Sequence, residues 1–343
     1  MNIFATKLQT NHHILIMLHK RIENLMQLRN LLLQSNDEFK QIKEKAEREN
    51  GWFIQPFIEK SIENICNNYL DENNLILYAA SILTSEQKNK VQTIGVTMAG
   101  NIPLVGFHDF LSVYLCGHQQ KIKLSSKDNI LLPYIIDCLY KIDPISKDII
   151  SIENMLKNCD AYIATGSNSS AMYFEKYFSK YPHIIRKNKT SVAVLTGDET
   201  GNDLEKLADD VYLYFGLGCR NITKIFVPQQ YNFEQLLNVF QKYDELKHHN
   251  KYRNNYDYNL ALYILNNQFY MTNESLLLIE NKNNFSAVST LHFEYYKDEI
   301  SIQNKEEIQA IVGAEFIPFG EAQSPTLFDF ADGVNTIEFL NSL

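Results

Sequence analysis

A short apolar run that leads into a glycine turn occurs at Thr93-Ile94-Gly95-Val96-Thr97-Met98-Ala99-Gly100-Asn101-Ile102-Pro103. Its first six residues predict a β-strand, Gly100 permits a tight turn, and Pro103 suits the first position of a following helix. Similar runs alternate with helical patterns along the rest of the chain. This alternation predicts right-handed βαβ units and parallel sheets with helices on both faces, and therefore the α/β class.

The remaining predicted elements follow the same two patterns. Further strands are predicted at residues 121–124, 162–164, 191–195, 224–227, 275–279, 287–291 and 308–312. Helices are predicted between them at residues 131–140, 171–178, 202–211 and 233–243. The first ninety residues show only helical patterns, so we expect a mostly helical N-terminal region. The basic run at residues 186–189 falls between two α/β blocks and is the predicted hinge.

Composition limits the classes of function. The chain has 343 residues, enough for two domains of about 150 residues each, and 45% of them are apolar. The net charge of −9 argues against nucleic-acid binding. The apolar run at residues 14–18 is too short for a membrane span or a secretory signal. Five cysteines without close pairs predict reduced thiols, no metal site and a cytoplasmic location.

Two predicted loops follow strands and open helices, where ligands bind in open α/β sheets. Asn101 lies in the first of them, and its amide either contacts a ligand or caps the next helix. The second loop contains Thr165, Gly166 and Ser167, whose hydroxyl and N–H groups suit a phosphate at a helix N-terminus. A serine-rich helix cap without a ligand has the same composition. The residues alone leave both alternatives open.

A third loop holds the candidate nucleophile. Cys219 lies in Gly216-Leu217-Gly218-Cys219-Arg220-Asn221, where the glycines allow close approach to a ligand and Arg220 favours a thiolate. The other four cysteines lie in apolar patterns typical of core residues. A fourth loop, residues 319–333, is rich in turns and carboxylates, and either covers a pocket or is a plain surface loop.

Five motifs in this order resemble the bacterial acyl-CoA reductases, relatives of the fatty-acid reductase of the bioluminescence pathway within the aldehyde dehydrogenase superfamily. The motifs occupy residues 99–104, 122–128, 164–168, 216–221 and 319–336, so the resemblance covers roughly residues 90 to 343. It implies an aldehyde-dehydrogenase-like fold with two Rossmann-like α/β domains. We expect residues 1–187 to form the helical region and the nucleotide-binding domain, residues 188–307 the catalytic domain, and residues 308–343 a return segment over the active site.

The resemblance also implies roles for single residues. Cys219 corresponds to the nucleophile, and Asn101 to the amide that holds the oxyanion together with the N–H of Cys219. Lys123, with Ser125 in the same motif, corresponds to the residues that bind the nucleotide ribose or its 2′-phosphate. Thr165, Gly166 and Ser167 correspond to the loop that faces the pyrophosphate, although Ala171 replaces the following glycine of the superfamily. The implied cofactor is NADPH.

One departure from the superfamily favours reduction. Hydrolytic aldehyde dehydrogenases carry a glutamate that activates water at the start of the first catalytic-domain strand, whereas this chain has no carboxylate between Glu175 and Asp198. A thioester without a general base resists hydrolysis and persists until hydride or a thiol arrives. We therefore expect the chain to reduce an acyl-CoA, of long chain length, to the fatty aldehyde. The expected partners are an acyl-CoA or acyl-protein thioester, an acyl-activating enzyme and further copies of the chain.

Two other functions remain open at this point. A sister enzyme that reduces an acyl phosphate, such as glutamyl phosphate, would use the same cysteine and nicotinamide. A non-catalytic acyl-binding scaffold would keep the fold without turnover. Among nearby residues, His108 and His292 either activate the thiol or are structural, and the basic residues Arg186, Lys187, Lys189 and Arg220 are candidate partners of CoA phosphates.

Overall fold

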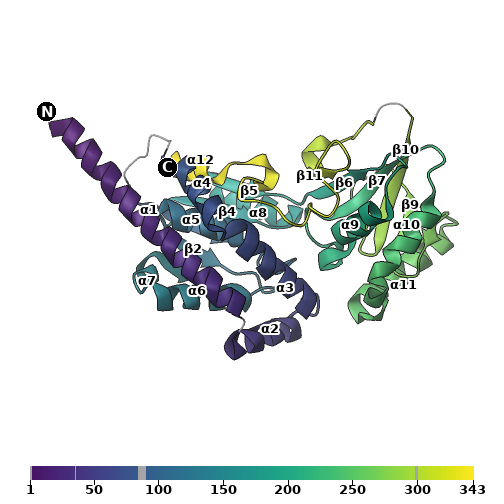
Figure 1. The fold of residues 1–343 in the computed structure, drawn as a ribbon, viewed down its shortest axis with the longest axis horizontal. Coiled ribbons are helices and arrows are strands. Elements are labelled where there is room, and N and C mark those ends of the chain that lie inside the picture. Colours follow the sequence, from purple (N-terminus) through teal and green to yellow (C-terminus); the bar gives the residue numbers. More distant parts are fainter. Residues whose placement is uncertain (1, 35, 84–89, 298–299) are drawn as a thin grey trace. The chain divides into compact units, whose positions relative to one another are not determined.

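The computed structural model describes residues 2–34, 36–83, 90–297 and 300–343 (Figure 1). It contains two compact units, each built around its own parallel sheet. The first comprises Met1–Lys187 and Thr326–Leu343, and the second comprises Asn188–Pro325. The predicted hinge at residues 186–189 spans the border between them. In the described part of the chain, no helix has the length and apolarity needed to cross a membrane.

The sheet of the first unit is entirely parallel, with strand order β3-β2-β1-β4-β5. The five strands are β1 (Thr93–Thr97), β2 (Gln119–Lys123), β3 (Ile150–Ile152), β4 (Ala161–Thr165) and β5 (His183–Arg186). Ile94 and Val96 of β1 are completely buried, and a Cβ atom on Gly95 would lie 2.8 Å from the ring of Tyr162. The chain proceeds outward from β1 to β3 and then returns to β4 on the other side. The switch point of this sheet therefore lies between β1 and β4.

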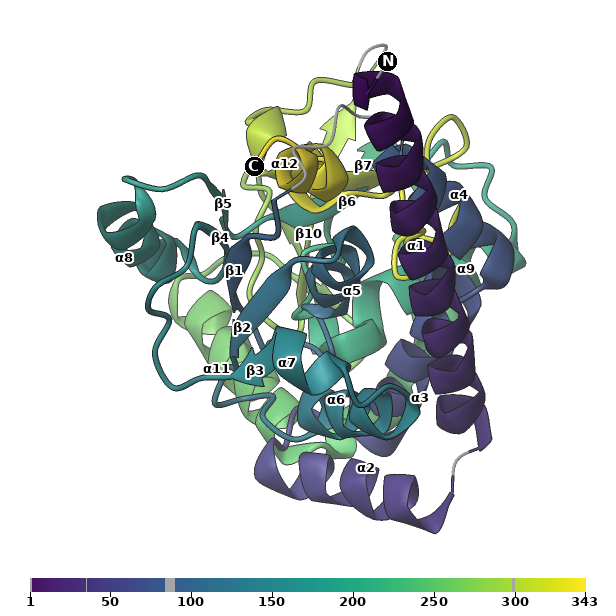
Figure 2. The ribbon, with the colours of Figure 1, turned by 90° about the vertical axis from the view of Figure 1, so that its left-hand side faces the viewer.

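Helices cover this sheet, and those that precede β1 form the predicted N-terminal region. The helices of this unit are α1 (Asn2–Gln34), α2 (Asp37–Glu49), α3 (Gln55–Asn64), η1 (Ile65–Tyr69), α4 (Glu72–Leu83), α5 (Phe107–Cys116), α6 (Leu131–Ile142), α7 (Ser146–Ile149), α8 (Asn168–Phe178), η5 (Ala331–Gly333) and α12 (Thr336–Asn341). Helix α1 packs against α4, α5 and α6 (Figure 2). The last helix, α12, returns the C-terminus to this unit, where it contacts α4 and α5.

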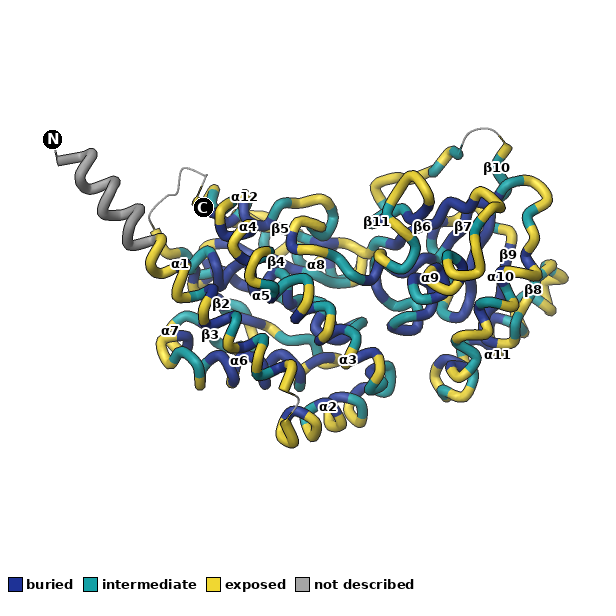
Figure 3. The backbone as a smooth tube through the Cα atoms, viewed as in Figure 1, coloured by how far each residue is buried: buried dark blue, intermediate teal, exposed yellow. Residues whose placement is uncertain are grey.

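The second unit holds a six-stranded sheet of order β11-β6-β7-β10-β9-β8, in which only β8 is antiparallel. Its strands are β6 (Thr190–Val194), β7 (Ile222–Pro228), β8 (Met271–Thr272), β9 (Leu277–Glu280), β10 (Thr290–Tyr296) and β11 (Ile308–Val312). Its helices are α9 (Gly201–Tyr212), η2 (Leu213–Gly216), α10 (Phe233–Val239), η3 (Phe240–His248), α11 (Asn250–Leu265) and η4 (Lys305–Glu307). Strand β6 is buried along its whole length (Figure 3).

The structure differs from the sequence-based expectation at several boundaries. Strand β11 pairs with β6, so residues 308–325 lie in the second unit, whereas we assigned them to the return segment. The short strands β3, β5 and β8 were not predicted. Pro103 does not start a helix, because residues 103–106 form a turn and α5 begins at Phe107.

Candidate functional site

The candidate residues of the first unit lie at one edge of its sheet. Asn101 follows β1, Lys123 ends β2, and Thr165 ends β4. These three strands are neighbours, and Thr97 at the end of β1 pairs with both Lys123 and Ala164. The structure therefore brings together the polar groups that follow three adjacent parallel strands, at the carboxyl edge where α/β sheets bind ligands.

The loop that carries Asn101 packs directly on the loop that carries Ser125. A Cβ atom at Gly100 would lie 2.7 Å from Oγ of Ser125 and 2.9 Å from the backbone nitrogen of Asp128, so only glycine fits there. The loop is also held by the N–H of Leu104, which donates to Oδ2 of Asp128 at 2.8 Å. These contacts fix the backbone on both sides of Asn101.

Asn101 does not cap the helix that follows it. The N-cap of α5 is Gly106, and no side chain caps this helix. The carbonyl of Pro103 instead accepts a hydrogen bond of 2.7 Å from the hydroxyl of Ser61, which anchors the loop to α3. The structure thus excludes the capping alternative for α5, and Asn101 lies half-buried in the turn.

Asp128 is a buried carboxylate at the base of the Asn101 loop, a position that was not predicted. Its side chain is 7% exposed, and burial raises the pKa of the carboxyl to about 6, although N–H groups of Leu104 and Leu131 oppose the shift. Asp128 is the last residue of the 122–128 motif, and this position is the only feature of the sequence that could have pointed to it. Its role is to hold the Asn101 loop against the end of β2.

The loop after β4 opens α8. Ser167 is the N-cap of this helix and accepts a hydrogen bond from the N–H of Ser170. A Cβ atom at Gly166 would lie 2.9 Å from Cβ of Ser170, so this turn is closely packed. Ala171, which stands where the superfamily has glycine, is 1% exposed and fits into the first turn of α8. The loop presents hydroxyl groups at the positive end of a helix, which suits an anion.

The second unit fixes the turn that carries Cys219. The side chain of Asn221 is completely buried, and its Oδ1 accepts from the N–H of Gly218 at 2.8 Å. Its Nδ2 donates to the carbonyls of Asp210, Val211 and Leu213 at 2.8–3.3 Å. The amide therefore ties the turn to the end of α9. Asn221 belongs to the 216–221 motif, but the sequence analysis gave it no role.

The chain between α9 and Cys219 has an unusual backbone. Tyr214, Phe215 and Gly216 have φ angles of +56°, +58° and +74°, so three successive residues are left-handed. Both aromatic side chains are buried, and the ring of Phe215 lies 4.4 Å from that of His249. This packing offsets the cost of the left-handed conformation and directs the chain to Cys219.

Cys219 itself is half-buried, and its carbonyl oxygen accepts a hydrogen bond of 3.0 Å from Oγ of Ser191 on β6. Burial disfavours a thiolate at the other four cysteines. Burial raises the pKa of Cys66 to about 11 and that of Cys116 to about 12, and it also raises the pKa values of Cys138 and Cys159. These four thiols are accordingly structural, as their apolar patterns predict.

Both candidate histidines have structural partners. A ring nitrogen of His108 lies 2.9 Å from the carbonyl oxygen of Leu327, and one of His292 lies 2.9 Å from that of Asn283. Burial lowers the pKa of His292. Both contacts match the structural alternative.

The prediction that Arg186 binds a CoA phosphate is wrong. Its side chain is 3% exposed and forms an ion pair of 2.6 Å with Asp109 inside the first unit. The neighbouring Lys187 is exposed and lies 2.8 Å from a carboxylate oxygen of Glu175. Basic character alone did not distinguish a buried ion pair from a solvated side chain.

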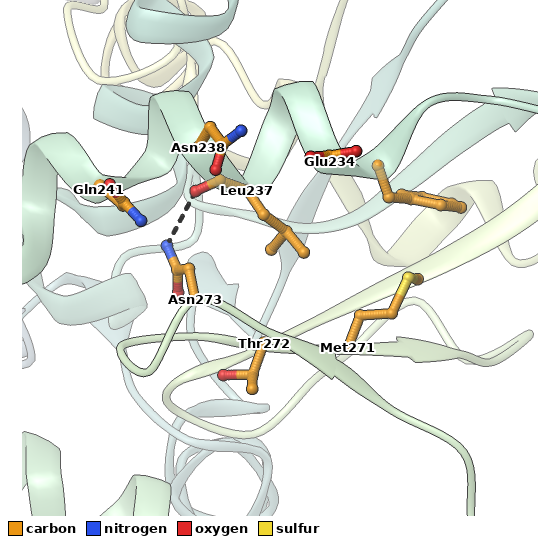
Figure 4. Close-up of a pocket in the computed structure, with 8 residues that line it drawn as sticks. Glu234, Leu237, Asn238, Gln241, Met271, Thr272 and Asn273 are labelled. Atoms are coloured by element: carbon orange, nitrogen blue, oxygen red, sulfur yellow. Dashed lines mark hydrogen bonds between the residues drawn. The ribbon is translucent and has the colours of Figure 1, made fainter.

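The described residues of the second unit line at least two cavities. The larger has a volume of about 310 Å³ and lies between α10 and β8 (Figure 4). Asn273 crosses it to donate to the carbonyl of Leu237, and none of the predicted site residues lines it. The smaller has a volume of about 20 Å³, and Phe215 and Gly216 are among the residues that line it. It has room for about one water molecule but not for an acyl chain.

No group of three or more His, Cys, Asp or Glu side chains that could hold a metal ion occurs within the described ranges.

Comparison with known proteins gives a family and a fold. A family model described as acyl-CoA reductase (LuxC) matches residues 18–242, well over half of the chain. No curated protein sequence matches the chain.

Similar solved structures are aldehyde dehydrogenases. Aldehyde dehydrogenase 21 from Physcomitrella patens, in complex with succinate, has a TM-score of 0.61 at 12% identity, over 82% of this chain and 69% of that one. An aldehyde dehydrogenase of Mycobacterium tuberculosis in complex with NAD⁺ gives the same four values. A mutant of aldehyde dehydrogenase C from Pseudomonas syringae, in complex with NAD⁺ and octanal, has a TM-score of 0.55 at 10% identity, over 81% and 67%. At these identities the likeness shows the aldehyde-dehydrogenase-like fold, as predicted.

Proposed function

Because the chain belongs to the acyl-CoA reductase (LuxC) family, we propose that it reduces a long-chain acyl-CoA to the fatty aldehyde through a thioester on Cys219. The observation that carries this proposal is the fixed turn around Cys219. The buried Asn221 amide holds Gly218 and three carbonyls at the end of α9, so the thiol is presented from a rigid backbone. Burial raises the pKa values of the other four thiols, which disfavours a thiolate at each of them.

In the first step, the Cys219 thiolate attacks the acyl carbonyl and the CoA thiolate leaves, taking up a proton. The side-chain amide of Asn101 and the N–H of Cys219 stabilise the oxyanion that forms. Each such donor contributes about 3 kcal/mol to stabilising the transition state. Asn101 suits this role because close packing at Gly100 and the hydrogen bond from Leu104 to Asp128 fix its loop.

The chemistry of β6 favours reduction over hydrolysis. Its sequence, Thr190-Ser191-Val192-Ala193-Val194, contains no carboxylate, and the hydroxyl of Ser191 donates to the carbonyl of Cys219. A hydroxyl that is used in this way is not a general base for water. The thioester on Cys219 therefore persists until it is reduced.

The first unit supplies the groups for a nicotinamide dinucleotide. Lys123 and Ser125 would hold the ribose and its 2′-phosphate, and Thr165, Gly166 and Ser167 would hold the pyrophosphate. The donor set fits, because it combines an exposed lysine with hydroxyl groups at the N-terminus of α8. When bound, NADPH supplies the hydride that converts the thioester to the aldehyde and frees the thiol.

The wider setting follows from this chemistry. The acyl donor is CoA or an acyl-protein thioester, and an acyl-activating enzyme must supply it. We place the reaction in the cytoplasm, since all five cysteines are free thiols, and we expect a homo-oligomer.

A spectrophotometric assay tests this proposal. The purified protein is given NADPH or NADH with acyl-CoAs of increasing chain length and, in parallel, with acyl phosphates. We expect oxidation of NADPH and formation of aldehyde with long-chain acyl-CoA. Turnover with acyl phosphates alone would instead identify the sister reductase. Acyl binding without turnover of either substrate would identify a scaffold.

A further inference from the structure

A buried carboxylate in the second unit holds a segment that has no role so far. Asp210, in the last turn of α9, is completely buried. Its Oδ2 accepts a hydrogen bond of 2.7 Å from the N–H of Gly320, and its Oδ1 accepts one of 3.1 Å from the N–H of Ala322. The side chain thus binds the backbone of the conspicuous loop at residues 319–325.

The backbone of the same residue holds the turn of the nucleophile. The carbonyl oxygen of Asp210 accepts from Nδ2 of Asn221 at 3.0 Å and from Nε2 of Gln323 at 3.3 Å. Asn221 in turn accepts from Gly218, one residue before Cys219. One residue therefore joins the Cys219 turn to residues 320–323.

The charge of Asp210 is costly where it lies. Burial raises the pKa of this carboxyl to about 7, the N–H groups of Gly320 and Ala322 lower it, and the negative charges of Asp209 and Glu321 raise it. The hydroxyl of Tyr243 on η3 also faces this charge, and Lys206 on α9 contacts the loop at Gly320. The N–H groups of Gly320 and Ala322 thus favour the ionised form, which burial disfavours.

We propose that Asp210 is a positioning residue of the reaction, whose ionised carboxylate holds residues 319–325 in register with the Cys219 turn. The inference rests on the proposed function. Only the carboxylate offers an acceptor to both N–H groups, because protonation turns one oxygen into a donor that faces an N–H. The loop is therefore released as the carboxyl becomes protonated.

The pH dependence of activity and that of stability distinguish a positioning role of Asp210 from a purely structural one. A raised pKa in the folded state means that the stability contributed by this group is present below pH 3.8 and is lost as pH rises through about 7. Activity should change in the opposite direction, because it needs the ionised form. A merely structural carboxylate would not give opposite trends.

The test compares Asp210→Asn with Asp209→Asn, the adjacent residue on α9, which accepts from Lys242 and Tyr243 near the surface. For the wild type we expect kcat to fall about ten-fold from pH 7 to pH 6 or just below, as the carboxyl is protonated. Asp210→Asn should be about ten-fold slower at pH 8 and should not lose activity further between pH 7 and pH 6, because its amide offers an acceptor to only one of the two N–H groups. Asp209→Asn should keep the wild-type kcat at pH 8 and the loss of activity in acid, displaced to lower pH because the charge of Asp209 raises the pKa of Asp210.

Amide hydrogen exchange at Gly320 and Ala322 provides a readout that needs no turnover. We expect faster exchange of both amides in Asp210→Asn at pH 8 and unchanged exchange in Asp209→Asn. If the wild type reduces no acyl-CoA, the proposed function fails, and the exchange result still decides whether Asp210 holds residues 319–325. Wild-type kcat and pH profile in Asp210→Asn, or unchanged exchange at both amides, would overturn the inference.

Discussion

Arg186 and Asp109 form a buried ion pair, with Nη2 of the arginine 2.6 Å from Oδ1 of the aspartate and side-chain exposures of 3% and 9%. The guanidinium also donates to the carbonyl of Ala331 and, at 3.0 Å, to Oγ1 of Thr336. The pair therefore connects the end of β5 and helix α5 with the C-terminal segment. All four residues belong to the first unit, so the pair ties the end of β5 to the C-terminal segment within that unit.

Removal of one partner should leave a buried, uncompensated charge. We expect Asp109→Asn to lower the free energy of unfolding by about 3–5 kcal/mol. The exposed pair Lys187–Glu175 is the matched control, because a surface ion pair is worth about 0–1 kcal/mol. Denaturant unfolding of Asp109→Asn and Lys187→Ala measures both. Equal, small losses in the two variants would contradict the role given to Arg186.

Gly100 should be irreplaceable for activity. A Cβ atom there meets Ser125 and the backbone of Asp128 at 2.7–2.9 Å, so Gly100→Ala must displace the loop of Asn101. We expect kcat to fall at least about ten-fold, with a stability loss of about 1–3 kcal/mol from overpacking.

The control for this substitution is Gly201→Ala at the start of α9, where an added Cβ atom meets nothing within 4 Å. It should leave activity unchanged and stability equal or slightly higher. Steady-state kinetics and thermal melts of Gly100→Ala and Gly201→Ala test both expectations. Full activity of Gly100→Ala would show that the loop position does not matter.

Asp128 should make the free energy of unfolding depend on pH. Burial raises the pKa of this carboxyl from 3.8 to about 6, so the stability it contributes is present below pH 3.8 and is lost as pH rises through about 6. We expect Asp128→Asn to gain up to about 3 kcal/mol relative to the wild type between pH 4 and pH 7.

Asp203→Asn is the control with the opposite sign. Hydrogen bonds from Thr200 lower the pKa of the Asp203 carboxyl, so its contribution is lost as pH falls. Unfolding free energies over this pH range check both variants. A difference between Asp128→Asn and the wild type that stays constant with pH would refute the prediction.

Lys123 should select the nucleotide. If its ammonium contacts a 2′-phosphate, Lys123→Ala should raise the KM for NADPH about ten-fold and leave that for NADH nearly unchanged. Lys121→Ala lies two residues earlier on β2, where the ammonium donates to the carbonyl of Lys157, and serves as the control. An equal change for both nucleotides would place the 2′-phosphate elsewhere.

The sequence was informative where a pattern reflects burial. Ile94 and Val96 of β1, and the valines of β6, form continuous apolar runs because both faces of a parallel sheet are covered. The strand predictions likewise placed Asn101 and Thr165 in loops that follow strands, and Lys123 within a strand, whereas the order of the strands was not predicted. Strands β3 and β5 were missed because three or four residues are too few to show a period.

Tertiary partners explain the remaining errors. Arg186 belongs to a basic run typical of solvated loops, and only Asp109, 77 residues earlier, makes its burial favourable. Asp210 binds backbone N–H groups that are distant in the sequence, and Asn221 binds backbone carbonyls at the end of α9. Because nearly every residue type carries the same backbone groups, the sequence gives no sign of these contacts. Pro103 suited a helix start, but its carbonyl bonds to Ser61 on α3 and the helix begins later.

The acyl-enzyme on Cys219 is the central claim, and intact mass spectrometry tests it most directly. The protein is incubated with a long-chain acyl-CoA in the absence of nucleotide, and the wild type is compared with Cys219→Ala and with Cys116→Ala, the other half-buried cysteine. The account predicts one acyl adduct on the wild type and on Cys116→Ala, its discharge on addition of NADPH, and no adduct on Cys219→Ala. An adduct that persists in Cys219→Ala, or none on the wild type, would contradict it.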